Sequence, residues 1–237
     1  MTPHPRLTAH LGATLLAALG LAACATPPAP PAWQSNAFAA LQGFTSAYLS
    51  GNTRLAAADF ARARAEIAST GRADLLARAE LTRCAARVAS LEFDLCAGYQ
   101  PLAPDAQAPE QAYAAYLTGH WDALEPALLP THHRALVLNA RARPAWPHSG
   151  GAQSLLDVIE DPLARLVAAG ALLQNGQLTP PDLLIATETA SGQGWRRPLL
   201  AWLGVQRQRA QDTGDMDTVA RLQRRMDLVL QTPLQKP

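Results

Sequence analysis

Apolar residues recur every three or four positions along most of the chain, which is the period of an amphipathic α-helix. Ala77, Leu81, Cys84, Val88 and Leu91, for example, follow steps of four, three, four and three residues. The pattern predicts helices over residues 36–50, 54–70, 72–91, 109–118, 121–128, 132–142, 152–174, 180–191, 195–212 and 215–231.

The composition points to the same fold class. Of 237 residues, 49 are Ala and 37 are Leu, whereas Ile and Val together number only 10. Ala and Leu favour helices, and the β-branched residues that favour strands are scarce. With 49% hydrophobic residues the chain can also build a packed core. We therefore expect an all-α fold.

Short polar turns that contain glycine separate several of the predicted helices, at Ser50-Gly51-Asn52, Thr118-Gly119-His120, Asn175-Gly176-Gln177 and Thr213-Gly214-Asp215. The first two turns lie 68 residues apart in similar contexts, which is twice the 34-residue period of tetratricopeptide repeats. The chain thus resembles a tetratricopeptide-like array or α-solenoid of stacked helical hairpins. The later turns break the period, so an irregular antiparallel bundle is an alternative. A proline-rich stretch suggests a possible subdivision near residue 147.

The N-terminal segment has the pattern of a secretory signal. Arg6 and an absence of acidic residues precede an apolar run over residues 11–21, which is shorter than the roughly 20 residues that a membrane-spanning helix needs. The run ends in Leu21-Ala22-Ala23-Cys24. This junction resembles the lipobox of bacterial lipoproteins, and more specifically those of a proteobacterial outer-membrane family. An ordinary signal peptide with Cys24 near its end by chance, or a buried helix, are the alternatives.

The lipobox resemblance implies an address rather than an activity. Residues 1–23 would be a cleaved signal peptide, and Cys24 would become the first residue and carry the lipid anchor that holds the protein to a membrane. Ala25 follows the cysteine where an Asp would favour the inner membrane, so the expected place is the outer membrane, facing the periplasm. Residues 24–35 would form a proline-rich linker, 36–231 the helical domain and 232–237 a flexible tail.

Two cysteines remain, Cys84 and Cys96, and an exported chain favours a disulfide between them. In one straight helix they would lie roughly 18 Å apart, whereas a disulfide needs Cα atoms within about 7 Å. The disulfide therefore requires that the chain reverse between residues 91 and 98. Two buried free thiols are the alternative.

Charge is balanced overall but segregated along the chain. There are 20 basic and 19 acidic residues, which does not suit nucleic acid. Residues 89–133 contain six acids and no Lys or Arg, whereas from residue 194 onward eight bases face four acids. These segments form either an acidic and a basic surface for partners or solvated helix faces that partly neutralise one another.

The densest aromatic and arginine cluster contains Trp195, Arg196, Arg197 and Trp202. Such residues are enriched at binding hot spots, which makes these four candidates for partner binding. Trp195 and Trp202 are seven residues apart and therefore share one helix face, so a stripe of core residues is the alternative.

No motif indicates a cofactor, a metal site or a known nucleophile. The chain lacks His-Glu-x-x-His, Gly-x-Ser-x-Gly and the phosphate-binding Gly-x-x-x-x-Gly-Lys sequence. We therefore expect a binding or scaffold protein of the cell envelope that recognises an envelope protein. The alternatives are an enzyme that acts on a cell-wall polymer, with acids such as Glu110 or Glu160, and a passive structural spacer.

Overall fold

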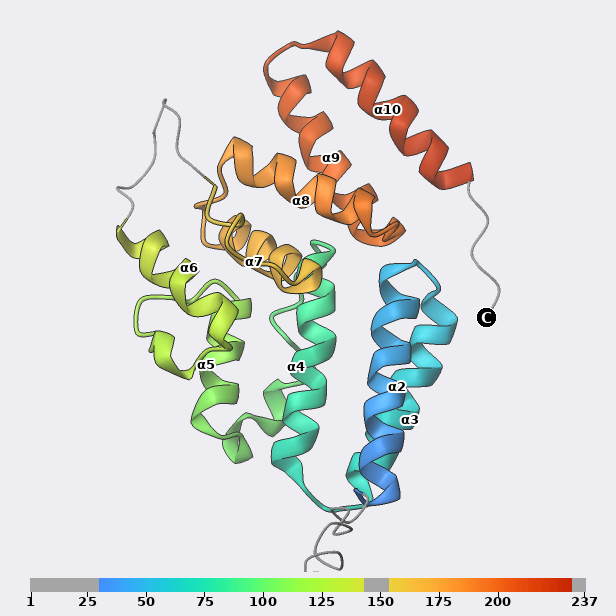
Figure 1. The fold of residues 1–237 in the computed structure, drawn as a ribbon, viewed down its shortest axis with the longest axis vertical. Coiled ribbons are helices and arrows are strands. Elements are labelled where there is room, and N and C mark those ends of the chain that lie inside the picture. Colours follow the sequence, from blue (N-terminus) through green and yellow to red (C-terminus); the bar gives the residue numbers. More distant parts are fainter. Residues whose placement is uncertain (1–29, 143–153, 232–237) are drawn as a thin grey trace, which may run out of the picture. The chain divides into compact units, whose positions relative to one another are not determined.

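The structure, a computed structural model, describes residues 30–142 and 154–231, and every regular element in these two ranges is helical (Figure 1). The α-helices are α2 (Ala32–Leu49), α3 (Thr53–Ala68), α4 (Ala73–Ala89), α5 (Ala108–Leu117), α6 (Thr131–Ala142), α7 (Pro162–Gln174), α8 (Pro180–Gly192), α9 (Arg196–Asp212) and α10 (Met216–Gln231). Two 3₁₀ segments, η2 (Gln100–Asp105) and η3 (Pro126–Leu128), lie between them. The predicted all-α class is confirmed.

Two predicted helices are wrong in whole or in part. Residues 121–128 form turns followed by η3, because Pro126 has no N–H group to continue an α-helix. The helix predicted over residues 152–174 begins only at Pro162. Asp161 caps it by accepting a hydrogen bond from the backbone N–H of Ala164 at 2.6 Å, and a capping side chain followed by proline fixes the start of the helix there.

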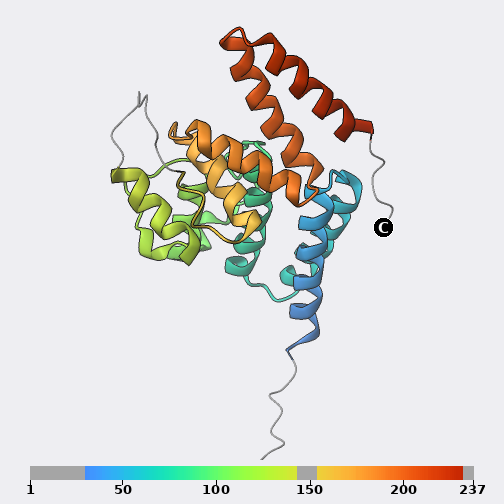
Figure 2. The same cartoon turned by 45° about the horizontal axis from the view of Figure 1, so that its top comes forward.

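Helix α4 lies at the centre of the packing, in contact with α3, α5 and α7. From α7 onward each helix packs against the one before it, α8 on α7, α9 on α8 and α10 on α9, and Figures 1 and 2 show this succession. Gly170 allows α7 to approach α4 closely, since a Cβ atom at this position would lie 2.4 Å from the carbonyl oxygen of Val88. The result is an array of packed helices, as expected.

The N-terminal hairpin of α2 and α3 has a small core of its own. The Phe44 and Phe60 rings meet with their centroids 5.1 Å apart, and both side chains are buried. The turn between the two helices needs Gly51, whose φ of 90° is strained for other residues. Asn52 then caps α3 by accepting from the backbone N–H of Leu55 at 3.2 Å. The predicted turn at residues 50–52 is confirmed.

The glycines of the other three predicted turns also have positive φ and follow the ends of α5, α7 and α9. Gly119, however, leads into the irregular segment before η3 rather than into a helix. The two similar turns 68 residues apart therefore do not belong to two equivalent helical hairpins.

Cys84 and Cys96 form a disulfide with their Cα atoms 5.1 Å apart. Helix α4 ends at Ala89, and Leu91, Leu95 and Cys96 have positive φ, which turns the chain back toward α4. Both the predicted disulfide and the predicted reversal are confirmed. Both cysteines are buried in the main core, so the bridge fixes the loop after α4 to the body of that helix.

Several predictions lie outside the described residues: the signal peptide over residues 1–23, the lipidated Cys24, most of the linker, the boundary near residue 147 and the tail over residues 232–237. Helices on both sides of residue 147 contribute to one core, since α7 packs against α4, α5 and α6. Within the described ranges, no helix combines the length and the apolar character that crossing a membrane requires.

Candidate binding groove beside Trp195

Trp202 does not belong to a binding surface. It lies in the middle of α9 with 0% of its surface exposed, and its indole Nε1–H donates to the carbonyl oxygen of Ala89 at 3.1 Å. This hydrogen bond joins α9 to the end of α4 inside the core. The interpretation of Trp202 as a partner-binding residue is therefore wrong, and the core-stripe interpretation holds for it.

Arg197, at the start of α9, holds the N-terminal hairpin to α9. Its Nε donates to the carbonyl oxygen of Tyr48 at 2.8 Å and its Nη2 to the hydroxyl of Thr53 at 2.7 Å. Its Nη1 donates to Glu92 Oε1 at 2.9 Å, and its guanidinium stacks 4.3 Å from the centroid of the Tyr48 ring. With all three nitrogens engaged, Arg197 stabilises the fold and is not free for a partner.

Tyr48 lies in the same contact between the N-terminal hairpin and α9. Burial raises the pKa of the Tyr48 hydroxyl well above its usual value, and the neighbouring Glu92 carboxylate raises it further. Tyr48 is therefore neutral at physiological pH. Arg196, next to Arg197, donates from its Nη2 to the carbonyl oxygen of Leu230, near the C-terminal end of α10, at 3.0 Å.

Trp195 lines an apolar groove, whereas Arg196 and Arg197 line a separate pocket that also contains Glu92. The groove has a volume of about 540 Å³ and is lined by α2, by Thr82 of α4 and by Trp195, which precedes α9. Along α2 its walls include Phe38, Leu41 and Leu49. Phe38 is 62% exposed, whereas Leu49 is buried. A large apolar side chain thus stands open to solvent at the rim of a groove with an aromatic wall.

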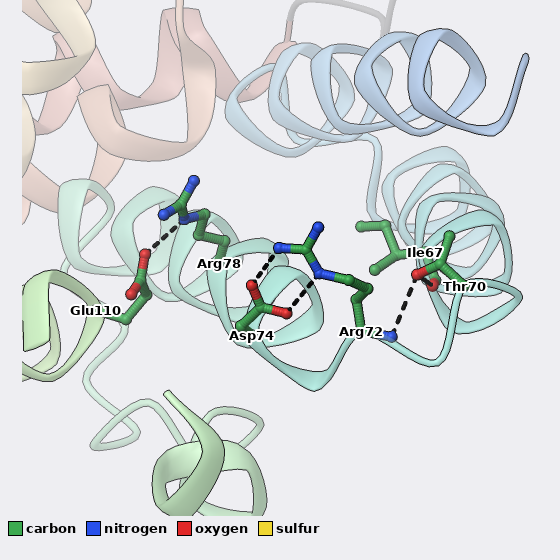
Figure 3. Close-up of polar contacts among 6 residues, drawn as sticks. All are labelled: Ile67, Thr70, Arg72, Asp74, Arg78 and Glu110. Carbon is green, nitrogen blue, oxygen red and sulfur yellow. Dashed lines mark hydrogen bonds and ion pairs between the residues drawn. The ribbon is translucent and has the colours of Figure 1, made fainter. Parts of the chain in front are cut away.

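The acidic segment over residues 89–133 is partly neutralised inside the fold. Glu92 pairs with Arg197 from the basic C-terminal third, and Glu110 pairs with Arg78 of α4, whose Nε lies 2.5 Å from Oε1 (Figure 3). Asp94 pairs with Arg87 at 3.3 Å. Of these contacts, only Glu92–Arg197 joins the acidic segment to the basic C-terminal third, whereas Glu110 and Asp94 pair with arginines of α4.

Among the described histidines, His133 has a structural role, whereas His120 and His132 are exposed. His133 is buried, and its Nδ1 lies 3.0 Å from the Tyr116 hydroxyl. Burial lowers the pKa of His133 to about 3, so its ring is neutral at physiological pH. Within residues 30–142 and 154–231, no three His, Cys, Asp or Glu side chains gather as metal ligands.

The two acids named for a possible enzyme are in different settings. Glu110 is 95% buried as a side chain and bound to Arg78, whereas Glu160 is exposed at the turn before α7. No described contact brings them together as a catalytic pair.

The sequence cluster identified Trp195, but not its partners in the groove. Phe38 and Leu41 lie on a helix more than 150 residues away, and only the fold brings them beside Trp195. The sequence did contain one indication that Phe38 is exposed. Phe38 is apolar but lies outside the buried face of α2, which is marked by Ala37, Ala40 and Phe44, and polar residues occur among the four positions before it.

Comparison of the chain with protein-family models, with curated proteins and with solved structures finds no match. The functional assignment therefore rests on the residues and the geometry described above.

Proposed function

We propose that the protein is a lipid-anchored binding protein of the bacterial cell envelope, which faces the periplasm from the outer membrane and recognises an envelope protein. The resemblance of Leu21-Ala22-Ala23-Cys24 to a lipobox supports the anchor at Cys24. Ala25 at the following position supports the outer membrane.

The observation that carries the binding role is the groove beside Trp195. Burial of apolar surface is the main favourable term in most protein association, and aromatic side chains dominate its hot spots. Phe38, at 62% exposure, and the half-buried Trp195 offer such surface in a concave setting. A partner that inserts an apolar side chain between them would bury both.

The groove also lies close to the anchor along the chain. Helix α2 begins at Ala32, eight residues after Cys24, and a chain of eight residues would reach at most roughly 25 Å if fully extended as polyproline. A lipid on Cys24 therefore confines the start of α2 to a layer near the bilayer surface. The proposed partner is an envelope protein that exposes an apolar segment within this layer.

The test is a pull-down of the native protein from its own cells after brief crosslinking, with proteins identified by mass spectrometry. Four forms are compared: wild type, Cys24→Ala, Phe38→Ala and Leu184→Ala. Leu184 is the matched control because it is a leucine 58% exposed on α8, away from the groove. We expect the wild type and Leu184→Ala to recover the same envelope protein, and the other two to lose it.

Equal recovery by all four forms would contradict both the anchor and the groove. Loss with Cys24→Ala alone would place recognition elsewhere on the anchored protein. Recovery of no defined partner by the wild type would favour a passive spacer. Incorporation of an alkyne-labelled fatty acid, present in wild type and absent in Cys24→Ala, tests the lipid directly.

A further inference from the structure

A second pocket, of about 470 Å³, lies between α4, α5, η3 and the start of α6. It shares only Thr82 with the groove beside Trp195. The proposed binding role does not use it. Its distinctive feature is a pair of arginines at its walls, Arg78 from α4 and Arg134 from α6.

Both arginines are held by their Nε atoms. Arg78 Nε is bound to Glu110 Oε1 at 2.5 Å, as Figure 3 shows, and Arg134 Nε donates to the carbonyl oxygen of Leu129 at 2.8 Å. Among the residues that the structure describes, no hydrogen bond engages an Nη atom of either side chain. Each guanidinium is thus oriented from one side and keeps its outer N–H groups for a ligand.

The rest of the pocket is largely apolar. Leu81 and Leu129 line it and are almost completely buried, and Tyr113 of α5 adds an aromatic wall. Leu128 of η3, 36% exposed, borders the same space. A ligand here would meet both guanidinium groups and hydrocarbon side chains, and the volume of the pocket lies within the range of small-molecule sites.

The charge of the lining residues selects the charge of the ligand. Arg78 and Arg134 contribute two positive charges and Glu110 one negative charge, so the pocket carries a net charge of one positive unit. A monoanion neutralises this charge, whereas a dianionic phosphate monoester would leave an unpaired negative charge beside apolar side chains. A cation would meet two guanidinium groups of its own sign.

We propose that this pocket binds a carboxylate attached to an apolar group. Such a group occurs in a short fatty acid and at the free C-terminus of a peptide that ends in apolar residues. The carboxylate accepts hydrogen bonds from the free Nη groups of Arg78 and Arg134, a geometry that guanidinium and carboxylate groups match well. The apolar group packs against Leu81, Leu129 and Tyr113. Glu110 acts as a positioning residue that orients Arg78.

Calorimetric titration of the purified full chain tests this, with N-acetyl-dileucine as the probe and its C-terminal amide as the matched uncharged ligand. Hexanoate and acetate form a second pair, in which only hexanoate carries a substantial apolar group. Inorganic phosphate is the purely ionic control. We expect the dileucine acid to bind about tenfold or more tightly than its amide, because a charge-assisted pair is lost.

The first variant changes an exposed side chain. Arg134 is exposed, so Arg134→Gln removes its charge with little risk to folding, and we expect about tenfold weaker binding of the dileucine acid. Arg224→Gln, which changes another exposed arginine, on α10, is the control and should bind as the wild type does. The double variant Arg78→Gln with Glu110→Gln keeps a neutral hydrogen-bonded pair and should also weaken binding.

Competition by hexanoate would assign the pocket to apolar carboxylates in general, and failure of hexanoate where the dipeptide binds would assign it to peptide C-termini. Equal binding of acid and amide would overturn the proposal. So would unchanged binding by Arg134→Gln, or binding of inorganic phosphate as tight as that of the dipeptide. These outcomes are independent of the groove, whose test uses Phe38.

Discussion

Helices α7 and α10 have similar lengths and opposite environments. Of the 13 residues of α7, eight are buried, whereas only Leu222 is buried among the 16 residues of α10. Helix α7 is in contact with α4, α5, α6 and α8, and α10 packs against α9 at the end of the array. The centre of the protein is therefore held from several directions and its C-terminal edge mainly from one.

This difference separates stability from recognition. Segments with few buried apolar contacts open locally at a lower free energy than the core does. Both surfaces proposed above for ligands involve elements outside the most buried part: the groove uses the exposed rim of α2, and the carboxylate pocket uses η3 and the ends of α5 and α6. Helix α4 at the centre positions these surfaces and also lines part of each, through Thr82 in the groove and through Arg78 and Leu81 in the pocket.

The largest effect expected from a single change is that of Trp202→Ala. The substitution removes a fully buried indole and leaves the Ala89 carbonyl without its donor, so the free energy of unfolding should fall by about 4 kcal/mol. Trp195→Ala, at a half-buried position, should lower it by less than half as much. Urea denaturation followed by circular dichroism measures both. Equal losses would remove the distinction between the core and groove tryptophans.

Acid should lower the free energy of unfolding through His133, a buried residue of α6. Its pKa of about 3 in the folded protein lies below the value of about 6.5 in the unfolded chain, so below pH 6.5 the unfolded state binds the additional proton. The stability that His133 contributes is complete above pH 6.5 and is lost as the pH falls toward 3. Between pH 6.5 and 4 this contribution should fall by about 3 kcal/mol.

The matched pair for this prediction is His133→Gln and His132→Gln, adjacent residues of which only the first is buried. Denaturation at a series of pH values should show a much flatter acid dependence for His133→Gln and only a small change for His132→Gln, because His132 is the lesser cause of the lowered His133 pKa. Parallel curves for His133→Gln and the wild type would show that His133 does not titrate as described.

Replacement by alanine should change the free energy of unfolding in opposite directions at two glycines. Gly170→Ala would place a Cβ atom 2.4 Å from the carbonyl oxygen of Val88, and moving α7 away from α4 should lower the free energy of unfolding by about 2 kcal/mol. Gly204→Ala, in α9 with open space around its Cβ position, should raise it by about 0.5 kcal/mol through the higher helix propensity of alanine. Thermal melting distinguishes the two directions, and stabilisation by both would show that the close approach is not needed.

The sequence was sufficient for features that local patterns control. The helix class follows from periodicity and from the abundance of Ala and Leu, and the disulfide was predicted from two remaining cysteines in a chain whose N-terminal pattern resembles a secretory signal. The start of α7 is also indicated locally, because Glu160 and Asp161 followed by Pro162 are typical of a helix N-terminus, and the prediction was wrong only in extending the helix upstream to residue 152.

Features that depend on distant parts of the chain could not be predicted in this way. Nothing near Arg197 in the sequence indicates that it would contact Tyr48 and Thr53, which are about 150 residues away. Trp195 and Trp202 share a local pattern, and only the packing of α9 against α4 assigns one of them to the core. Both proposed surfaces combine side chains from three or more elements, so their geometry appears only in the folded chain.

The smallest expected effects are those of substitutions on α10, the helix at the C-terminal edge of the array. On α10, Leu222 is buried against α9, whereas Leu228 is 67% exposed two turns later. Leu222→Ala should lower the free energy of unfolding by about 2 kcal/mol if α10 unfolds together with the rest of the protein. It should have a smaller effect if α10 opens separately, and hydrogen exchange of the α10 amides would then rise while that of α7 stays unchanged. Leu228→Ala should change stability by less than about 0.5 kcal/mol, because most of its surface is already exposed. A loss as large as that of Leu222→Ala would show that the exposed end of α10 is covered in solution, and the C-terminal edge would then be an interface rather than a free end.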